Sequence, residues 1–478
     1  MTTENTARAR AARAAARAAV TEPIPIADVG AVGDAGRTDA GETRETVHRR
    51  RRSAAPSPEW ESAATVVAFI LAVAVGSRLV VAAGVTVGML LAIVLAPVWL
   101  SAAAKYRWAG TFLGLGALCA VTAPVLTELA GHGHAVDPLL ERENYVRLAE
   151  LVLGAGALLW ARLHLGVRWL AVAYGVGMLV DVVQRGEASF KFGAGLGVSV
   201  LVLGWLIPGL RPGRGVWRRV PRTTQAAACV GLGVLFALDD GRSAFAMLLL
   251  TAAVVLWQVR IDERSLRRSA AVTVGAVVAA GLAAYGGARS LILDGAFGTA
   301  MAQRTAAQIE VSGNLLAAGR PEMGATAALI AHRPMGFGPG VPLNGHDLAV
   351  AKNGMSLLGY DPENNYVYEY MFGRGIELHS LFGDFWAVYG PAGVLLWLFL
   401  LLLVLTSLVR RTVRGMADAL LVYVAILTAW NLFFSPIYAS VPMLILAVVV
   451  LLPRWADATE EDVEPPGEAA TAEGAGPT

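Results

Sequence analysis

The sequence predicts an all-α, polytopic membrane protein with about twelve transmembrane helices and one long extracytoplasmic loop. The composition is the first reason: 56% of the residues are hydrophobic, only 16% are charged, and the mean hydropathy is +0.56. Soluble domains carry roughly 25% charged residues. The second reason is that the apolar residues come in blocks of about 17–25, the length that crosses a bilayer as a helix. The third is that arginine and lysine gather in alternate short loops.

The apolar blocks set the expected order of the spans. Nine of them fall within 61–291 and three within 384–453, on either side of a polar and aromatic loop at 292–383. The first is the weakest, because Ser77 and Arg78 could lie within one bent hairpin. In chain order we expect spans near 63–76, 79–100, 108–129, 146–164, 167–184, 194–210, 223–238, 243–259, 269–291, 384–408, 416–434 and 437–453.

The distribution of basic residues orients these spans. If the N-terminus lies inside, every predicted inner loop is basic, as in the group Arg410, Arg411 and Arg414, and the short outer loops hold fewer cations. The 292–383 loop then lies outside the cytoplasm, and both termini are cytoplasmic. Residues 1–60 are expected to be a disordered basic tail, with a basic helix on anionic lipid as the alternative, and residues 454–478 a disordered acidic tail.

Several classes of protein are disfavoured by features that the sequence lacks. Cys119 and Cys229 both fall inside predicted spans, so they suit neither an exported disulfide framework nor a zinc site. The chain has no phosphate-binding P-loop and no G-x-S-x-G elbow, and its predicted cytoplasmic loops are too short for an ATP-driven domain. We therefore expect no cofactor, and the energy for any reaction must come from the substrate.

The chemistry-bearing residues lie in and around the long loop. Gly319-Arg320 comes first, then the turn-rich run from Pro334 to Gly340, and then His379, which is followed by Gly390 and Gly393 at the next span. An earlier Gly241-Arg242-Ser243 opens the eighth span. This order resembles the O-antigen ligase and O-antigen polymerase family. The likeness covers roughly 240–410 by motif and the remainder only by span count.

The resemblance implies a membrane glycosyltransferase of the bacterial cytoplasmic membrane. Such enzymes move a glycan from a polyprenyl-diphosphate carrier to a hydroxyl of a glycan or glycolipid acceptor, outside the cytoplasm. The implied partners are this donor, the acceptor and the lipid bilayer, with no nucleic acid. The reaction needs cationic donors for the diphosphate, for which arginine is well suited, and a base for the acceptor hydroxyl.

The resemblance also assigns roles to individual residues. Arg242 and Arg320 are expected to bind the diphosphate as catalytic cations, and His379 to act as the base, kept neutral by the helix N-terminus beside it. Arg333 and His346 are further substrate-binding candidates within the loop. Each residue also has a purely structural alternative. Arg242 could pair with an acid in its own loop or anchor the chain at the membrane interface, and Arg320 could simply be solvated. His379 could be an interfacial histidine without a catalytic role.

No metal site is expected, because the loop histidines lack regular ligand spacing and the first outer loop is too short for paired acids. Asp384 could orient His379 or cap the next helix, and capping is preferred. The run from Pro334 to Gly340 is most simply a sharp turn. Where the family often has asparagine after the motif histidine, this chain has Ser380.

Other functions remain open. A repeat-unit polymerase of the same family would share these motifs. A polysaccharide or lipid transporter would need ionisable pairs in mid-span, and the predicted spans hold few. A structural assembly protein would not need the arginine and histidine set.

Overall fold

The computed structural model describes residues 58–210, 217, 218, 220–258, isolated positions between 272 and 306, and 320–456. The two predicted tails therefore lie almost entirely outside the described residues. The same holds for most of the span predicted at 269–291 and for most of 292–319.

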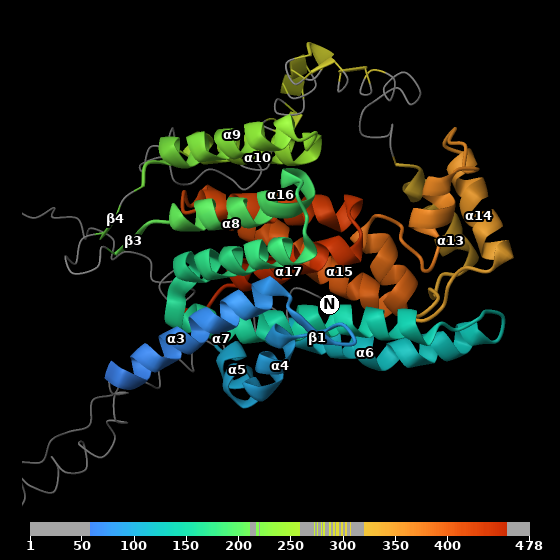
Figure 1. Cartoon of the computed structure of the whole chain (residues 1–478), viewed down its shortest axis with the longest axis horizontal. Coiled ribbons are helices and arrows are strands. Elements are labelled where there is room, and N and C mark those ends of the chain that lie inside the picture. Colours follow the sequence, from blue (N-terminus) through green and yellow to red (C-terminus); the bar gives the residue numbers. More distant parts are fainter. Residues whose placement is uncertain are drawn as a thin grey trace, which may run out of the picture. The chain divides into compact units, whose positions relative to one another are not determined.

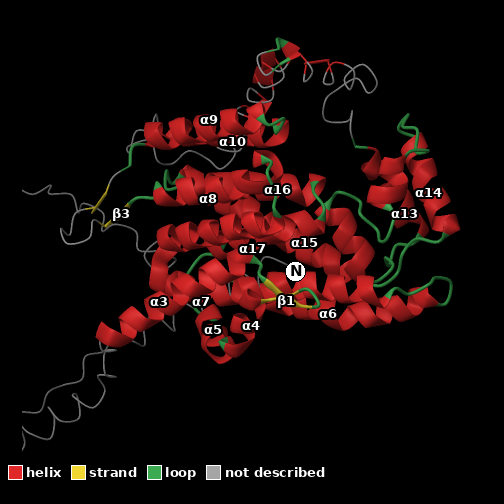
Figure 2. Cartoon of the chain, in the orientation of Figure 1, coloured by secondary structure: helices red, strands yellow, loops and turns green. Residues whose placement is uncertain are grey.

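The described chain is mostly helical (Figure 2). The elements are α3 (Pro58–Ser77), β1 (Val80–Ala82), β2 (Val85–Thr86), α4 (Val87–Val94), α5 (Ala96–Ala103), α6 (Ala109–Gly131), α7 (Pro138–Arg185), the π-helix η1 (Phe190–Ala194), α8 (Gly195–Trp205), β3 (Gly209–Leu210), β4 (Trp217–Arg218), α9 (Arg222–Leu238), α10 (Arg242–Trp257), α13 (Pro321–His332), α14 (Gly345–Ser356), the π-helix η4 (Tyr366–Met371), α15 (Leu381–Val413), α16 (Ala419–Phe434) and α17 (Ile437–Leu451).

Three described helices, α6, α7 and α15, are long and apolar enough to cross a membrane by length and composition. Shorter apolar helices accompany them at Ser62–Ser77, Phe190–Trp205, Arg222–Leu238, Arg242–Trp257, Ala419–Phe434 and Ile437–Leu451. The prediction of a helical, membrane-type protein is confirmed at this level. Helices α3, α8 and α17 pack on α7, and α15 packs against α6, α16 and α17 (Figure 1).

The single span predicted at 79–100 is wrong. This segment begins with a short antiparallel hairpin, β1 paired with β2, and continues as the two short helices α4 and α5. Ala83 and Gly84 form the turn of this hairpin with φ of 52° and 85°. These left-handed values are incompatible with a helix running through the segment. The β-branched Val80, Val81 and Val85 beside the turn favour the extended conformation.

The predicted boundary between the spans at 146–164 and 167–184 is found inside α7, which consists of two helices on either side of a non-helical Gly166 (φ 66°, ψ 171°). Residues from both parts, such as Arg147 and Arg185, line one cavity, so the chain turns back at this glycine. Arg162 was expected in a short inner loop between them, but it lies within α7 and is buried. Its Nη1 donates to the backbone carbonyls of Val449 (2.6 Å) and Leu452 (2.8 Å), the end of α17. Buried charge is tolerated there because these carbonyls satisfy it.

The polar segment before α15 is not an irregular loop. It contains α13 and α14, which pack on each other, and the π-helical turn η4. These elements enclose a second apolar core, separate from that of the long helices, around Phe337, Met355 and Trp386. Trp386 belongs to α15, so this core joins the segment to the first turns of that helix.

The glycine-rich run from Pro334 to Gly340 does more than turn the chain. The backbone N–H groups of Phe337 and Gly338 donate to the carbonyl of Ala387 in α15, at 2.8 and 3.0 Å. A Cβ on Gly336 would come within 2.3 Å of the Trp386 carbonyl oxygen, and a Cβ on Gly390 within 2.4 Å of the Met335 carbonyl oxygen. Glycine at both positions lets the two backbones touch, and this contact fixes the segment against the break in α15.

We expect Gly390→Ala to destabilise the protein by about 1–3 kcal/mol, the usual cost of overpacking. Gly390 has φ 58° and ψ −142°, so the new side chain would also meet backbone strain. Thermal unfolding in detergent, followed by size-exclusion chromatography, measures the effect. Gly110→Ala is the control, since nothing lies within 4 Å of a Cβ at that position of α6. Equal melting temperatures for the two variants would contradict the proposed contact.

Candidate functional site

His379 lies in the tight turn that enters α15, two residues before the helix begins at Leu381. Its φ of 48° is unusual for a residue other than glycine. Ser380 is the N-cap of α15, and its hydroxyl accepts from the N–H of Gly383 at 3.4 Å. The sequence-based placement of His379 at a helix N-terminus is therefore confirmed.

The hydrogen bond of the His379 ring defines which nitrogen is available for chemistry. Nδ1 lies 3.3 Å from the carbonyl oxygen of Glu377. A carbonyl only accepts, so Nδ1 carries the proton of this bond. In the described part of the chain no group bonds to Nε2. In the neutral tautomer, Nε2 is then a free acceptor, as a general base requires.

Asp384 positions this turn. The carboxylate is buried, with one oxygen accepting from the N–H of Leu378 and the other from the N–H of Ile437, both at 2.8 Å. The preference for Asp384 as the helix cap is wrong, because Ser380 fills that role. Its carboxylate instead ties the residue before His379 to the start of α17.

Asp384→Asn is expected to lower both stability and activity. An amide keeps one oxygen acceptor but points an NH₂ group at the other backbone N–H, so about 1–3 kcal/mol of a buried hydrogen bond is lost. Thermal unfolding measures the stability, and kcat measured below the melting temperature tests the positioning of His379. A fall in stability alone, with kcat unchanged, would limit Asp384 to a structural role.

Arg320 is the N-cap residue of α13 and lies against the end of α16. Its guanidinium carbon is 4.9 Å from the ring centre of Phe434 and 5.6 Å from that of Trp430, and Nη1 donates to the Phe434 carbonyl at 3.4 Å. Burial lowers the pKa of Arg320, although the nearby Glu322 and Tyr366 oppose this effect. Arg320 is therefore not a solvated side chain, which was the structural alternative for this residue.

Glu322 and Tyr366 connect Arg320 to His379. The Tyr366 hydroxyl donates to Glu322 Oε1, and the Tyr366 ring centre lies 5.7 Å from that of His379. Burial, and then the charge of Glu322, raise the pKa of Tyr366, which keeps its hydroxyl protonated as a donor. Glu322 Oε2 is buried and has no hydrogen-bond partner among the described residues. Such an oxygen is a candidate ligand contact.

Glu322 and Tyr366 were not found by sequence reasoning. Glu322 directly follows Arg320-Pro321 and occupies the first turn of a helix, a position where acids are common for dipole reasons alone. Tyr366 is one of several tyrosines in an aromatic run, and nothing in its spacing distinguishes it. We name Arg320, Glu322, Tyr366 and His379 together the Arg320–His379 cluster.

A second cation, Arg147 of α7, lies near Glu377, two residues before His379. Arg147 and Glu377 line the same cavity, of about 180 Å³. Burial raises the pKa of Glu377, while the charges of His379 and Arg147 act in the opposite direction. Arg147 Nη1 donates to Asn144 at 2.9 Å. In the sequence, nothing distinguishes Arg147 from the other cations of the predicted short outer loops.

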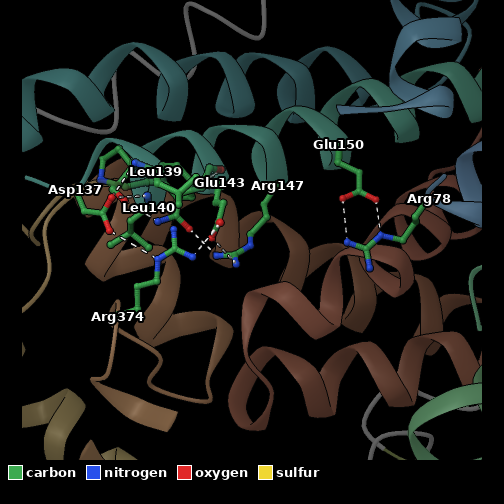
Figure 3. Close-up of polar contacts among 11 residues, drawn as sticks. Arg78, Asp137, Leu139, Leu140, Glu143, Arg147, Glu150 and Arg374 are labelled. Carbon is green, nitrogen blue, oxygen red and sulfur yellow. Dashed lines mark hydrogen bonds and ion pairs between the residues drawn. The ribbon is translucent and has the colours of Figure 1, made fainter. Parts of the chain in front are cut away.

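Figure 3 shows the charged groups along this part of α7. Arg374 reaches from the segment before α15 to Glu143 (3.1 Å) and Asp137 (3.7 Å), and Arg147 lies on the other side of Glu143 (3.7 Å). Hydrogen bonds from the N–H groups of two residues in the first turn of α7 lower the pKa of Asp137. These pairs join the segment that carries His379 to α7.

Arg242 is the first residue of α10 and lies 3.6 Å from Asp240. This ion pair within the loop is one of the structural alternatives expected for Arg242. Helices α10 and α16 pack antiparallel, since Gln258 after α10 bonds to Ala417 before α16 (3.0 Å). Arg242 is therefore at the same end of the helices as Phe434 and Arg320.

Arg333 and His346 lie away from the cluster. Arg333 is the C-cap of α13, so roughly 18 Å of helix separates it from Arg320. It stacks on Phe337 at 5.2 Å. His346 is exposed at the start of α14, and its ring centre is 5.0 Å from that of His332. A substrate that touched both groups would have to extend along the whole of α13.

His332 belongs to a small polar group that also includes Asp347 and His134. The buried Asp347 accepts a short hydrogen bond from His134 and lies 3.3 Å from His332 Nε2. Nowhere in the described ranges are three histidine, cysteine or acidic side chains placed to hold a metal ion. Metal independence stays a prediction to be tested in solution.

Comparisons with known proteins give no further identification. A scan against protein-family models finds no match, and neither a search of curated proteins nor a search of solved structures finds one. The likeness to O-antigen ligases and polymerases therefore rests on the motifs alone.

Proposed function

We propose that the protein is a glycosyltransferase that moves a glycan from a polyprenyl-diphosphate carrier to an acceptor hydroxyl, with inversion and without a metal. The observation that carries the proposal is the arrangement of His379. Its Nδ1 is held by a carbonyl, and Nε2 is without a partner among the described residues. Tyr366 and Glu322 connect His379 to Arg320, and the charges of His379 and Arg147 both act on Glu377. A base with cations in its neighbourhood suits attack of a hydroxyl on a sugar diphosphate.

In this mechanism, Nε2 of His379 takes the proton of the acceptor hydroxyl as its oxygen attacks the anomeric carbon. The bond between that carbon and the diphosphate oxygen breaks, and the polyprenyl diphosphate leaves with the electron pair. Arg320 and Arg147 neutralise the charge that develops on it. Arg242, at the same end of the helices, is a third candidate contact for the carrier. Glu322 Oε2 is placed to accept from a sugar hydroxyl.

The proposal includes about twelve spans and a site on the extracytoplasmic side of a bacterial cytoplasmic membrane. Supporting this, the chain has apolar helices of spanning character, and the basic group Arg410, Arg411 and Arg414 lies at the end of α15 remote from His379. By the positive-inside rule that end faces the cytoplasm.

Purified protein, lipid-linked donor and acceptor in liposomes should suffice for transfer, with EDTA present and ATP absent. The reason is that the sugar–diphosphate bond already carries the driving force and that arginines take the place of a metal ion. Chromatography of labelled product measures the reaction. If Mg²⁺ or Mn²⁺ restored a reaction that EDTA had abolished, the protein would be a metal-dependent transferase.

The polymerase alternative shares this chemistry and differs only in its acceptor. Product length decides between them: a ligase adds one preformed chain, whereas a polymerase gives a ladder that grows by repeat units. A transporter is the candidate from another class, and the pair of Arg78 with the buried Glu150 (2.7 Å) is the feature that favours it. Movement of labelled lipid-linked glycan across liposomes without any acceptor would support the transporter.

A further inference from the structure

A second candidate site lies at the opposite end of the long helices. A cavity of about 870 Å³ opens between α6 and α15. From Ala392, just after the break in α15, to Arg410 at this cavity the helix rises roughly 27 Å, so it is separate from the Arg320–His379 cluster. Ligand sites in proteins commonly measure about 300–1,000 Å³. The cavity is lined by Arg107, Trp108, Thr111, Arg162, Phe399, Leu402, Leu403, Thr406, Ser407, Arg410, Arg411, Arg414, Met416, Leu451 and Pro453.

One part of this lining is strongly basic. It includes five arginines, and no carboxylate of the described chain lies within ion-pair distance of Arg107, Arg410 or Arg411. Among the described acids, Asp418 is in electrostatic reach of Arg411: burial raises the pKa of Asp418, and the charge of Arg411 acts in the opposite direction. No acid is among the described residues that line the cavity. Within the described part of the chain, an anion would therefore meet several positive charges and no carboxylate in the lining.

The other part of the lining is apolar. Phe399, Leu402 and Leu403 of α15 face the cavity together with Leu451 of α17. Leu402 is 52% exposed, as is Trp108 of the turn before α6. Arginines around one end of an apolar cleft between helices match a lipid, whose phosphate is charged and whose chains are hydrocarbon. The positive-inside rule explains why arginines gather at the cytoplasmic end of the predicted spans. It does not explain why they line a cavity.

We propose that this cavity binds an anionic phospholipid, with its phosphate among Arg107, Arg410 and Arg411 and an acyl chain along Phe399 and Leu402. Guanidinium groups make bidentate, charge-assisted hydrogen bonds to phosphate. A lipid bound there would join α6 to α15 and α17, and would stabilise the folded state by mass action. The inference does not depend on the proposed transfer reaction.

The test uses the full-length protein in neutral detergent. Phosphatidylglycerol should raise the melting temperature and should remain bound in native mass spectrometry, and phosphatidylcholine should do neither. In the double variant Arg410→Gln/Arg411→Gln the affinity for phosphatidylglycerol should fall at least about tenfold, because each lost charge-assisted contact is worth about 1.5–3 kcal/mol. Arg185→Gln, an exposed arginine at the other end of α7, is the control and should bind normally.

A second variant keeps the test informative if the double variant does not fold. Leu402→Trp adds bulk at an exposed position and should block the chain without removing any charge. Inorganic phosphate and a short polyprenyl phosphate serve as competitors. Equal binding of both phospholipids, unchanged binding by the double variant, or full competition by inorganic phosphate alone would overturn the lipid assignment. Preferential retention of the polyprenyl phosphate would overturn the phospholipid as the occupant.

Discussion

Replacing His379 with alanine is expected to abolish glycan transfer while leaving expression and membrane insertion intact. General-base catalysis contributes about 10²–10⁴-fold to a rate, and a loss of that size would leave activity near background. The reason is structural: Nδ1 is engaged by the Glu377 carbonyl, so Nε2 is the nitrogen that can take a proton. Transfer of labelled glycan in liposomes measures the loss.

The backbone at His379 requires a second variant. At φ 48°, alanine adds strain that asparagine tolerates better, so His379→Asn separates the loss of the base from the loss of the turn. Both variants should be inactive, and the asparagine variant should melt close to the parent. His132→Ala, an exposed histidine after α6, is the matched control and should be fully active. Normal transfer by His379→Asn would exclude the histidine as base and leave Glu322 as the next candidate.

The sequence was sufficient to predict the helical, apolar body and the entry of α15. These follow from composition and from short motifs, which depend on neighbouring residues only. The hairpin at β1 and β2 was missed because Val80, Val81 and Val85 are as apolar as a span, and hydropathy does not distinguish a strand from a helix. The ordered helices α13 and α14 were missed because polar composition was interpreted as a loop.

The candidate site was predicted only in part, since its parts come from distant segments. His379 and Arg320 were found from motifs, whereas Arg147, Glu322 and Tyr366 join them through tertiary contacts that no local pattern records. Asp384 shows the same limit. Its place five residues after His379, at the start of the predicted span 384–408, suggested capping, but its second oxygen binds the N–H of Ile437, more than fifty residues away.

Arg320→Lys is expected to lose most transfer activity, although lysine keeps the positive charge. The guanidinium lies 4.9 Å from the ring centre of Phe434 and within electrostatic reach of Glu322. A planar guanidinium can bind two diphosphate oxygens at once, and an ammonium cannot. Loss of one charge-assisted contact worth about 1.5–3 kcal/mol corresponds to a roughly 10- to 150-fold lower rate. Arg242→Lys should lose most activity too if that arginine contacts the carrier, and its pair with Asp240 would not require the fork.

Burial makes the lysine variant of Arg320 more severe than a change of shape. The environment already lowers the pKa of the arginine, and a lysine at that position would be far closer to losing its proton. The transfer rate of Arg320→Lys relative to the parent should therefore fall further as the pH rises. Arg185→Lys, an exposed pair partner of Asp181, is the control and should follow the parent at every pH. If Arg320→Lys and Arg242→Lys both matched the parent across that range, the two arginines would be anchors at the membrane interface and the diphosphate would have to be bound by Arg147 alone.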